Sequence, residues 1–347
     1  MQESRRIDAH NGYGAAESFT DSKETQVRQC RIGFVGAGNV AARHARHLAS
    51  LPEVRLVAVS DPVVERCTTF AARYGMRAVG DLESLLAQQL DAVYVCVPPF
   101  AHGTVEERIA AAGAAVFVEK PLGVDASVPE QVRRALERAG VVTAVGHHWR
   151  YSAAVRRAQD LLAGRRVRLV TGAWLDKLPP VPWWSRRSNS GGQVVEQAVH
   201  VLDLARVLVG EVTEVYATAD PRPPRVDDAD VDGATAATLR FACGAVGTLA
   251  ATCLLGWKHR AGLEIYAEEL ALTVTEEGIE VHDGDGVQRF PVCPDEAKLA
   301  ADRAFVAAVL GRGDGVLVPY GEALRTHHVA CAITRSVVEG RPVRPEG

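Results

Sequence analysis

The sequence lacks long apolar runs, paired cysteines and any excess of positive charge. No run reaches the roughly 18 apolar residues at which a membrane-spanning helix becomes a candidate. The seven cysteines are scattered and form no C-x-x-C pair, which argues against a disulfide framework and a thiolate zinc site. A formal net charge of −4 gives no electrostatic reason for nucleic acid or an anionic membrane to be the main partner. We therefore expect a cytoplasmic protein that acts on a small molecule.

The chain is long and apolar enough to form two domains. It has 347 residues, of which 47% are hydrophobic, so it can bury a sizeable core. Residues 1–28 are polar and aperiodic, and they are expected to form a disordered or loosely docked tail. Because the Arg5-Arg6 pair precedes no apolar stretch of signal-peptide length, export is not expected.

Two patterns of secondary structure divide the rest of the chain. In residues 29–150 short apolar strands alternate with helices, which predicts an α/β domain with a doubly wound parallel sheet. In residues 151–347 strands follow one another, and an Asp-Gly turn lies at 283–286. This half is predicted to be a second α/β domain with a large, mainly antiparallel sheet, whose final helix packs back on the first domain. Strands are expected at 31–36, 54–61, 77–80, 91–99, 115–121, 141–151, 166–176, 212–219, 233–241, 244–255, 261–267, 270–275 and 278–290, and helices at 39–50, 62–75, 82–89, 102–112, 126–139, 151–163, around 196–200, at 296–310 and at 321–339.

A glycine-rich turn follows the first predicted strand. In GFVGAGNVA, Gly36, Gly38 and Ala41 fit the pattern G-x-G-x-x-G/A, whose backbone approaches a pyrophosphate at the start of a helix. A structural glycine turn is the simpler alternative, but the second strand ends in Asp61, 25 residues after Gly36, where an acid can accept ribose hydroxyls. Asp61 would repel a 2′-phosphate and therefore favours NAD. Arg66, one turn further on, could instead grip that phosphate, so NADP remains an alternative.

A lysine lies at the end of the strand predicted at 115–121. In VFVEKP, Lys120 follows Glu119 at the carboxyl end of the strand, where ligands bind in open parallel sheets. A surface Glu-Lys pair is the ordinary alternative. At this edge, however, an ammonium about 4 Å from a developing alkoxide would stabilise it by roughly 4 kcal/mol at an effective dielectric of 20, before desolvation costs. We therefore expect Lys120 to point at a substrate oxygen.

Five motifs occur together in one order: GFVGAGNVA, CVPPFAHG, EKP, GHHWRY and GGQVVEQAVH. From about residue 30 onward the sequence resembles the glucose-fructose oxidoreductase, inositol dehydrogenase and rhizopine-catabolism (Gfo/Idh/MocA) family. The resemblance implies an N-terminal Rossmann domain, a C-terminal α/β domain, and NAD(P)-dependent oxidation or reduction of a sugar, cyclitol or related polyol. The residues expected to bind the cofactor are Gly36, Gly38, Asn39, Val40, Asp61, Arg66, Val97, Pro98, His102, Glu119 and Lys120.

The resemblance also assigns chemistry to three residues. Lys120 matches the catalytic lysine of the family, His200 matches the histidine that ends its D-x-x-x-H motif, and Glu196 stands where the family usually has Asp. At i and i+4 on a helix the last two share one face, so His200 can take a hydroxyl proton while Glu196 orients it or holds a neighbouring hydroxyl. An ordinary structural helix pair is one alternative. A metal half-site is another, but no third ligand stands at a recognisable spacing, so no metal is expected.

Three further residues are expected to bind the substrate. Arg150 and Tyr151 match an Arg-aromatic pair of the family and are expected to line the cleft, although a domain-boundary salt bridge would explain them equally well. Trp183, in the Pro, Trp and Arg-rich loop at 178–192, offers an aromatic face to a sugar ring; its alternative is packing against the sheet or a partner subunit. The Glu196 carboxylate is expected to contribute to the same cleft.

Histidines outside this set are expected to have less direct roles. His102 aligns with a family histidine near the cofactor, with a helix-opening role as the alternative. By resemblance, the Lys120–Pro121 peptide bond is expected to be cis. The remaining histidines interpreted as structural are His147, His148, His327 and His328.

Small residues alternate through GAVGTLAATC at 244–253, which predicts a sheet face that no helix of the same chain covers. Since monomers rarely expose a large apolar face, we expect sheets of two subunits to pack as a dimer or a dimer of dimers.

Three function classes remain open: a net dehydrogenase or reductase, a redox-neutral lyase, epimerase or glycosidase with tightly bound NAD, and a non-catalytic dinucleotide sensor. The presence of Lys120 and His200 argues against the sensor, which needs no proton acceptor.

Overall fold

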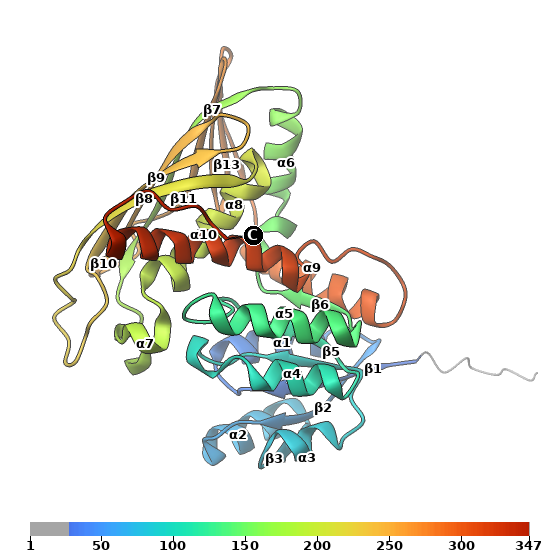
Figure 1. Ribbon diagram of the computed structural model, residues 1–347. Helices are drawn as coiled ribbons and strands as arrows, with labels where there is room; N and C mark the ends of the chain where they lie inside the picture. The colour runs from blue at the N-terminus through green and yellow to red at the C-terminus, as the bar shows by residue number, and fades with distance from the viewer. Residues whose placement is uncertain (1–27, 347) are drawn as a thin grey trace, which may run out of the picture.

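The computed structural model describes residues 28–346, which build two sheets and the helices around them (Figure 1). The predicted tail lies outside the described residues except for Arg28, whose guanidinium lies 2.8 Å from a carboxylate oxygen of Asp91. In the described part of the chain, no helix has both the length and the apolar composition needed to cross a membrane.

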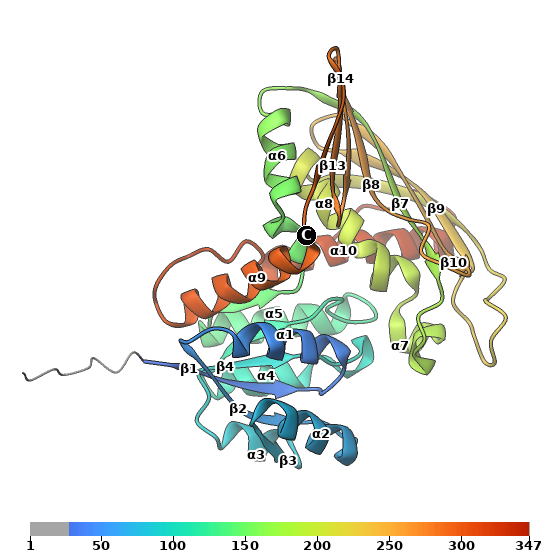
Figure 2. The same ribbon diagram turned by 180° about the vertical axis from the view of Figure 1, so that it is seen from behind.

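The first domain is a six-stranded sheet with helices on both faces (Figure 2). All five pairings are parallel, in the order β3-β2-β1-β4-β5-β6, which confirms the doubly wound sheet. Strands β4 and β5 are buried throughout because helices cover both of their faces. Strands β2 and β3 are added on one side of β1, and strands β4, β5 and β6 on the other side. Open sheets of this kind bind ligands at the point where the strand order changes direction in this way. The elements are β1 (Cys30–Val35), α1 (Asn39–Ala49), β2 (Val54–Ser60), α2 (Val64–Tyr74), β3 (Arg77–Val79), α3 (Leu82–Leu86), β4 (Ala92–Val95), η1 (Pro99–Ala101), α4 (Thr104–Ala111), β5 (Ala115–Val118), α5 (Ser127–Ala139), β6 (Thr143–Val145) and η2 (His148–Tyr151).

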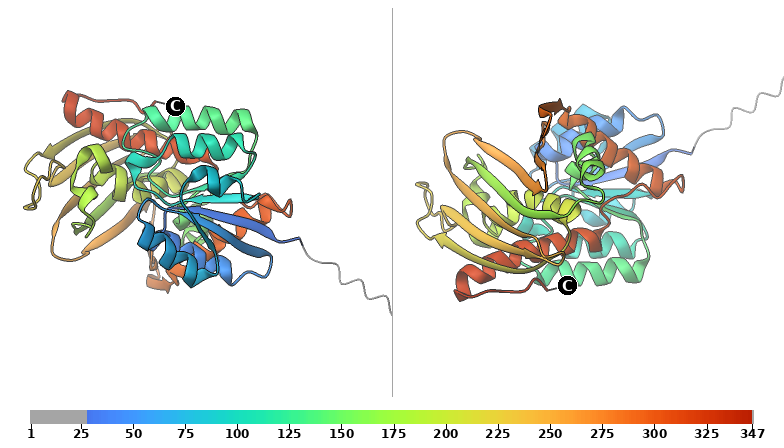
Figure 3. Two further views of the ribbon diagram at one scale, coloured as in Figure 1. Left: turned by 90° about the horizontal axis from the view of Figure 1, so that it is seen from below. Right: turned by 90° about the horizontal axis from the view of Figure 1, so that it is seen from above.

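The second domain contains an eight-stranded sheet in the order β14-β13-β12-β11-β7-β10-β9-β8. Only β7 and β10 pair in parallel, so the sheet is mainly antiparallel, as expected. Helices α6, α8 and α10 pack on one face, and the strands form an outer wall of the domain (Figure 3). The elements are α6 (Ala153–Leu162), β7 (Val167–Lys177), η3 (Pro182–Ser185), α7 (Arg187–Ser190), η4 (Val194–Ala198), α8 (Val199–Val209), β8 (Val212–Asp220), β9 (Ala234–Phe241), β10 (Val246–Leu255), β11 (Arg260–Ala267), β12 (Leu270–Thr275), β13 (Gly278–Asp283), β14 (Gly286–Pro291), α9 (Pro294–Val309) and α10 (Tyr320–Glu339).

The last two helices contact both domains. Helix α9 packs against α1 and η2 of the first domain, and Figure 2 shows it beside α1. Helix α10 packs mainly on β8 and α8 but also contacts α5 and β6. The two helices therefore fix how the carboxyl edge of the first sheet meets the second domain.

Two of the differences from the sequence predictions lie beside the candidate site. The strand predicted at 141–151 ends at Val145, and the chain turns at Gly146 into the 3-10 helix η2. A Cβ at Gly146 would lie 2.6 Å from a carboxylate oxygen of Glu119, so only glycine fits this turn. The helix that contains Glu196 and His200 begins as the π-helix η4 before it continues as α8. Apolar periodicity reveals neither change, because buried strands and buried turns are equally apolar.

Candidate active site

A cavity of about 430 Å³ lies at the carboxyl end of β5, between the two domains. Its lining includes all three residues to which the sequence assigned chemistry, Lys120, Glu196 and His200. Lys120 comes from the loop after β5, Glu196 from η4 and His200 from the first turn of α8. Residues separated by up to 80 positions thus meet at the sheet edge where ligands of doubly wound folds bind.

Lys120 and Glu196 form an ion pair across this cavity. The lysine Nζ donates to Glu196 Oε1 at 2.8 Å and to the Glu196 backbone carbonyl at 2.7 Å. The Nε1 of Trp184 donates to the other carboxylate oxygen at 2.7 Å. The peptide bond that follows this lysine, Lys120–Pro121, is cis, as expected.

Neither carboxylate oxygen of Glu196 bonds to His200, so the expectation that Glu196 orients His200 needs correction. Both oxygens are committed to Lys120 and Trp184. The physical reason is the π-helix, which contains Glu196 and ends two residues before His200, so the two side chains do not have the relative directions of an α-helical i, i+4 pair. Glu196 therefore holds the lysine instead of the histidine.

His200 is buried among aromatic rings and faces the cavity. Its ring stacks with Trp149 and Trp174 at centroid distances of 5.7 and 5.9 Å. Burial, reinforced by the charge of Lys120, lowers the pKa of His200 well below its usual value, so the imidazole is neutral at pH 7. A neutral imidazole can accept a proton from a hydroxyl. Its Nδ1 is buried and has no hydrogen-bond partner among residues 28–346.

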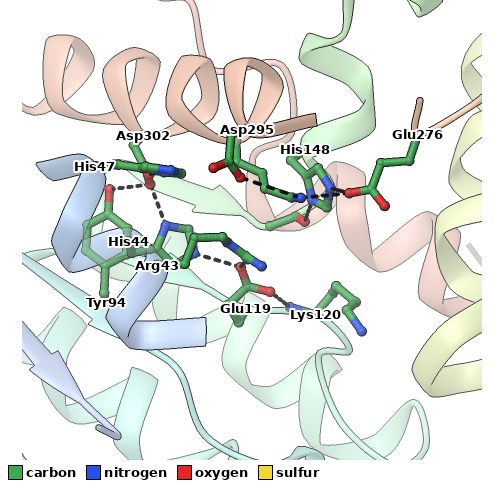
Figure 4. A network of polar contacts seen from close by, with 12 residues as sticks. Arg43, His44, His47, Tyr94, Glu119, Lys120, His148, Glu276, Asp295 and Asp302 are labelled. Carbon is green, nitrogen blue, oxygen red and sulfur yellow. Dashed lines mark hydrogen bonds and ion pairs between the residues drawn. The ribbon is translucent and has the colours of Figure 1, made fainter. Parts of the chain in front are cut away.

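Glu119, the residue before Lys120, belongs to a buried network centred on His44 (Figure 4). The ring of His44 lies between two carboxylates, with Nδ1 2.6 Å from Asp302 Oδ1 and Nε2 2.8 Å from Glu119 Oε1. Because ionised carboxylates only accept hydrogen bonds, both nitrogens donate and the imidazole is protonated. The Tyr94 hydroxyl donates to Asp302 as well, at 3.2 Å.

The pKa values of the network agree with these charges. Burial alone would lower the pKa of His44, but Asp302 and Glu119 raise it to about 9. Burial alone would raise the pKa of Glu119, but His44 lowers it to about 2. The network therefore ties the EKP motif of the first domain to α9, the helix that carries Asp302.

The residues around the glycine motif fit a dinucleotide. Gly36 has a φ of 94°, and a Cβ there would lie 2.3 Å from the carbonyl oxygen of Cys96. Nothing lies within 4 Å of a Cβ at Gly38, and no side chain caps the start of α1. The first N–H groups of the helix, at Asn39 and Val40, are therefore available to a pyrophosphate. Val97 borders the same turn, with its Cγ1 3.6 Å from a Cβ placed at Gly36.

Asp61 lies at the end of β2 and is held from three directions. Its carboxylate accepts from the backbone N–H groups of Ala37 and Val63, both at 2.8 Å. Arg66 donates to both oxygens, at 2.6 and 3.0 Å. Burial opposes ionisation, but the hydrogen bonds from Arg66 and the backbone lower the pKa of Asp61. A 2′-phosphate at this position would meet the carboxylate together with the arginine.

Arg150 and Tyr151 do not line the cavity, which corrects the expectation that they bind substrate. Arg150 makes a bidentate ion pair with Asp203 at 2.6 and 2.8 Å and also contacts Glu322 at 3.0 Å. The Tyr151 hydroxyl accepts from the backbone N–H of Leu317 at 2.8 Å. Both residues are buried because strand 141–151 turns into η2, and Arg150 forms the boundary salt bridge that the sequence left open.

The remaining predicted residues lie outside the lining of this cavity. His102 follows η1 and lies 2.5 Å from Glu106, whose other oxygen accepts from the backbone N–H of Gly103 at the start of α4. Pro98 precedes η1. Trp183 packs beside Trp184, and it is Trp184 that reaches Glu196.

Sequence reasoning missed several residues of the cavity. His148, interpreted as structural, lines it and bonds to Glu276 at 3.2 Å, and its ring lies 5.3 Å from that of His200. The stretch GHHWRY was a possible signal, because polar residues in a supposed buried strand need a reason. The other lining residues to which the sequence assigned no role are Arg43, Trp149, Trp174, Pro179, Gln197, Lys258, Glu276 and Lys298.

Comparison with known proteins agrees with the fold and the cofactor cradle. Residues 30–147 match the oxidoreductase family with an NAD-binding Rossmann fold, and residues 155–273 match the GFO/IDH/MocA C-terminal domain. The chain therefore belongs to the Gfo/Idh/MocA family. It is an NAD-dependent oxidoreductase, which confirms the activity class and the cofactor expected from the sequence.

Individual relatives resemble the chain over nearly its whole length. Inositol 2-dehydrogenase of Rhizobium meliloti (strain 1021) is 30% identical, over 90% of this chain and 98% of the relative. A crystal structure described as a putative myo-inositol dehydrogenase from Sinorhizobium meliloti 1021 superposes with a TM-score of 0.77 at 26% identity, covering 92% of this chain and 100% of the other. The structure of GenD2 from gentamicin A biosynthesis, in complex with NAD, gives 0.81 at 25% identity, covering 92% and 97%.

Proposed function

We propose that the chain transfers a hydride between NAD and a secondary hydroxyl or ketone of a sugar, cyclitol or sugar derivative. The observation that carries the proposal is the meeting of Lys120, Glu196 and His200 in one cavity beside the dinucleotide cradle. The relative named inositol 2-dehydrogenase supports a cyclitol or a sugar as the substrate class.

Three side chains divide the chemistry of oxidation. The neutral His200 accepts the hydroxyl proton as the carbon–oxygen bond gains double-bond character. The Lys120 ammonium stabilises the negative charge that develops on that oxygen. Glu196 holds the ammonium in place by accepting from Nζ at 2.8 Å. NAD would supply the hydride acceptor when bound, and the N–H groups of Asn39 and Val40 at the start of α1 would hold its phosphates.

A panel assay tests this proposal. Purified protein is incubated with NAD or NADP and with monosaccharides, inositols, aminocyclitols and nucleotide sugars, and NADH formation is followed by absorbance. Oxidation of at least one compound, with NAD preferred over NADP, is the expected result. Conversion of a compound with no net NADH, by protein that retains tightly bound cofactor, would instead establish the redox-neutral alternative.

Assembly and location complete the proposal. Exposed and buried residues alternate along β8, β9 and β10, so one face of these strands is exposed. Tyr216, Val246 and Leu254 on these strands are more than 40% exposed. We infer that this face packs against a second copy, as a dimer or a tetramer. A cytoplasmic location is supported by the seven cysteines, all of which are free thiols.

A further inference from the structure

Two lysines on the second-domain side of the cavity share a single carboxylate. Lys298 on α9 lies 2.8 Å from Glu276 Oε1, and Lys258, from the turn between β10 and β11, lies 3.7 Å from Oε2. His148 also contacts this carboxylate, at 3.2 Å (Figure 4). Burial lowers the pKa of His148, so the ring is neutral at pH 7 and adds no charge. Two ammonium groups therefore face one carboxylate.

The other charges of the cavity are matched one to one. Lys120 pairs with Glu196 at 2.8 Å. The carboxylates of Glu119 and Asp302 face two cations, protonated His44 and Arg43, which lies 3.4 Å from Glu119.

Among the described residues that surround the cavity, this leaves one positive charge in surplus, at the Glu276 cluster. Lys298 also lies 4.0 Å from Asp295, but that carboxylate is at the surface and contacts Arg46 at 3.1 Å. The surplus therefore remains on the two lysines.

Of the two lysines, Lys258 has the weaker contact with Glu276 and is therefore the one whose positive charge is less fully paired. Its distance to Glu276 exceeds that of a hydrogen bond, and its side chain is 39% exposed. Its ammonium lies 5.6 Å from the centre of the Trp174 ring, which itself stacks with His200 at 5.9 Å. An anionic group held by Lys258 would thus share the cavity with a hydroxyl held at His200.

We propose that the substrate is a polyhydroxy acid, such as an aldonate or a uronate, whose single carboxylate binds Lys258 and Lys298 while its reacting hydroxyl lies at His200. This inference rests on the proposed function. In the oxidation the carbon gives its hydride to NAD, the hydroxyl proton passes to His200, and the product is the corresponding keto acid. One surplus charge matches a carboxylate better than a phosphate dianion.

Matched pairs of compounds test the inference on the intact protein. D-gluconate is compared with D-glucitol, and D-glucuronate with D-glucose, by calorimetric titration of the NADH complex and by steady-state oxidation with NAD. We expect the acid of a pair to bind at least about 10-fold more tightly than the neutral compound, and to lose this advantage as salt is raised. Lys258→Gln is expected to remove this advantage, by weakening binding of the acid more than binding of the neutral compound. Lys177→Gln, at an exposed lysine of β7, is the control and should change neither.

The outcomes separate this inference from the proposed function. If neutral compounds bind and are oxidised as well as the acids, the acid subsite is rejected and the oxidoreductase assignment to polyols stands. If the acids bind through Lys258 but no compound is oxidised, the subsite stands and the proposed reaction is rejected. If no acid binds at millimolar concentration, or if Lys258→Gln leaves the preference intact, the inference is overturned.

Discussion

Lys120 and Glu196 join the two domains at the candidate site, because the lysine ammonium donates to both the side chain and the backbone carbonyl of the glutamate. The lysine belongs to the loop after β5 and the glutamate to the π-helix η4. The ammonium that we propose to stabilise charge on the substrate oxygen is thus positioned by the domain that is expected to bind the substrate. Substitutions of Lys120, Glu196 and His200 are therefore expected to have different effects on catalysis and on NAD binding.

The first prediction concerns proton transfer by His200. His200→Ala should lower turnover by about 100-fold to 10,000-fold, the usual contribution of a general base. NAD affinity should stay nearly unchanged, because the glycine motif lies in the other domain. Titration of NAD followed by steady-state kinetics across pH measures both effects. Near-normal turnover in the variant would show that His200 is structural and that another group takes the proton.

The second prediction concerns the hold of Glu196 on Lys120. Glu196→Gln keeps the size of the side chain but removes its charge, so the ammonium loses a charge-assisted hydrogen bond. We expect kcat/KM to fall by at least about 10-fold, the cost of one such bond, with a smaller change in NAD affinity. Glu107→Gln, on α4, serves as the control and should have no effect. Equal kinetics of the two variants would reject the positioning role.

The third prediction concerns cofactor choice. Asp61→Ser should weaken NAD binding and improve NADP binding, because it removes the carboxylate and releases the guanidinium of Arg66 that now pairs with it. We expect the ratio of the two kcat/KM values to move toward NADP by at least about 10-fold. Asp160→Ser, at an exposed position of α6, is the control. An unmodified protein that already prefers NADP would contradict this prediction.

The fourth prediction is a pH dependence of stability that arises from His44. The folded pKa of about 9 exceeds the ordinary value of 6.5, so the imidazolium stabilises the fold fully below pH 6.5. This contribution is lost as the pH rises through 9. Between pH 7 and 9.5 the free energy of unfolding should fall by on the order of 1 to 3 kcal/mol more in the unmodified protein than in His44→Gln.

Denaturant titrations at each pH measure this difference, with His282→Gln as the control at a partly exposed histidine. If His44→Gln does not fold, NMR titration of the unmodified protein reports the same group directly. A His44 imidazole that loses its proton near pH 6.5 would disprove the charged network.

The fifth prediction concerns assembly through the open sheet face. Ala250 is exposed in the middle of β10, so Ala250→Arg would place a charge inside a sheet-to-sheet interface. Sedimentation should show the unmodified protein as a dimer or tetramer and the variant as a smaller species. Ala111→Arg, at the exposed end of α4, should leave the assembly unchanged. A monodisperse monomer of the unmodified protein at micromolar concentration would contradict the proposal.

Much of the fold could be predicted because its signals are local. Alternation of short apolar strands with helices gave the first sheet, and the Asp-Gly turn at 283–286 gave the β13–β14 hairpin. The glycine motif and the EKP motif each occupy consecutive residues, so their positions on strand ends could also be recognised.

What could not be predicted depends on contacts between distant segments. His44 became recognisable only when α9 brought Asp302 beside it, 258 residues along the chain. Lys258 and Lys298 belong to no motif, and their importance comes from the single carboxylate that they share. Arg150 carried a family motif but pairs with Asp203, because a buried guanidinium requires a partner. Sequence patterns therefore indicated the three candidate residues that meet in the cavity better than the residues that support them.

The π-helix at 194–198 makes the length of this segment as consequential as its composition. A π-turn contains one residue more than the equivalent α-turn. Removing Gln197 or Ala198, which lie between Glu196 and His200, would restore α-helical hydrogen bonding and rotate the preceding chain relative to α8 by about 100°. Glu196 and His200 would both survive such a deletion, yet they could no longer face Lys120 and the cavity together. Sequence identity at the reacting positions is thus insufficient to preserve this site, since the spacing between them encodes their directions.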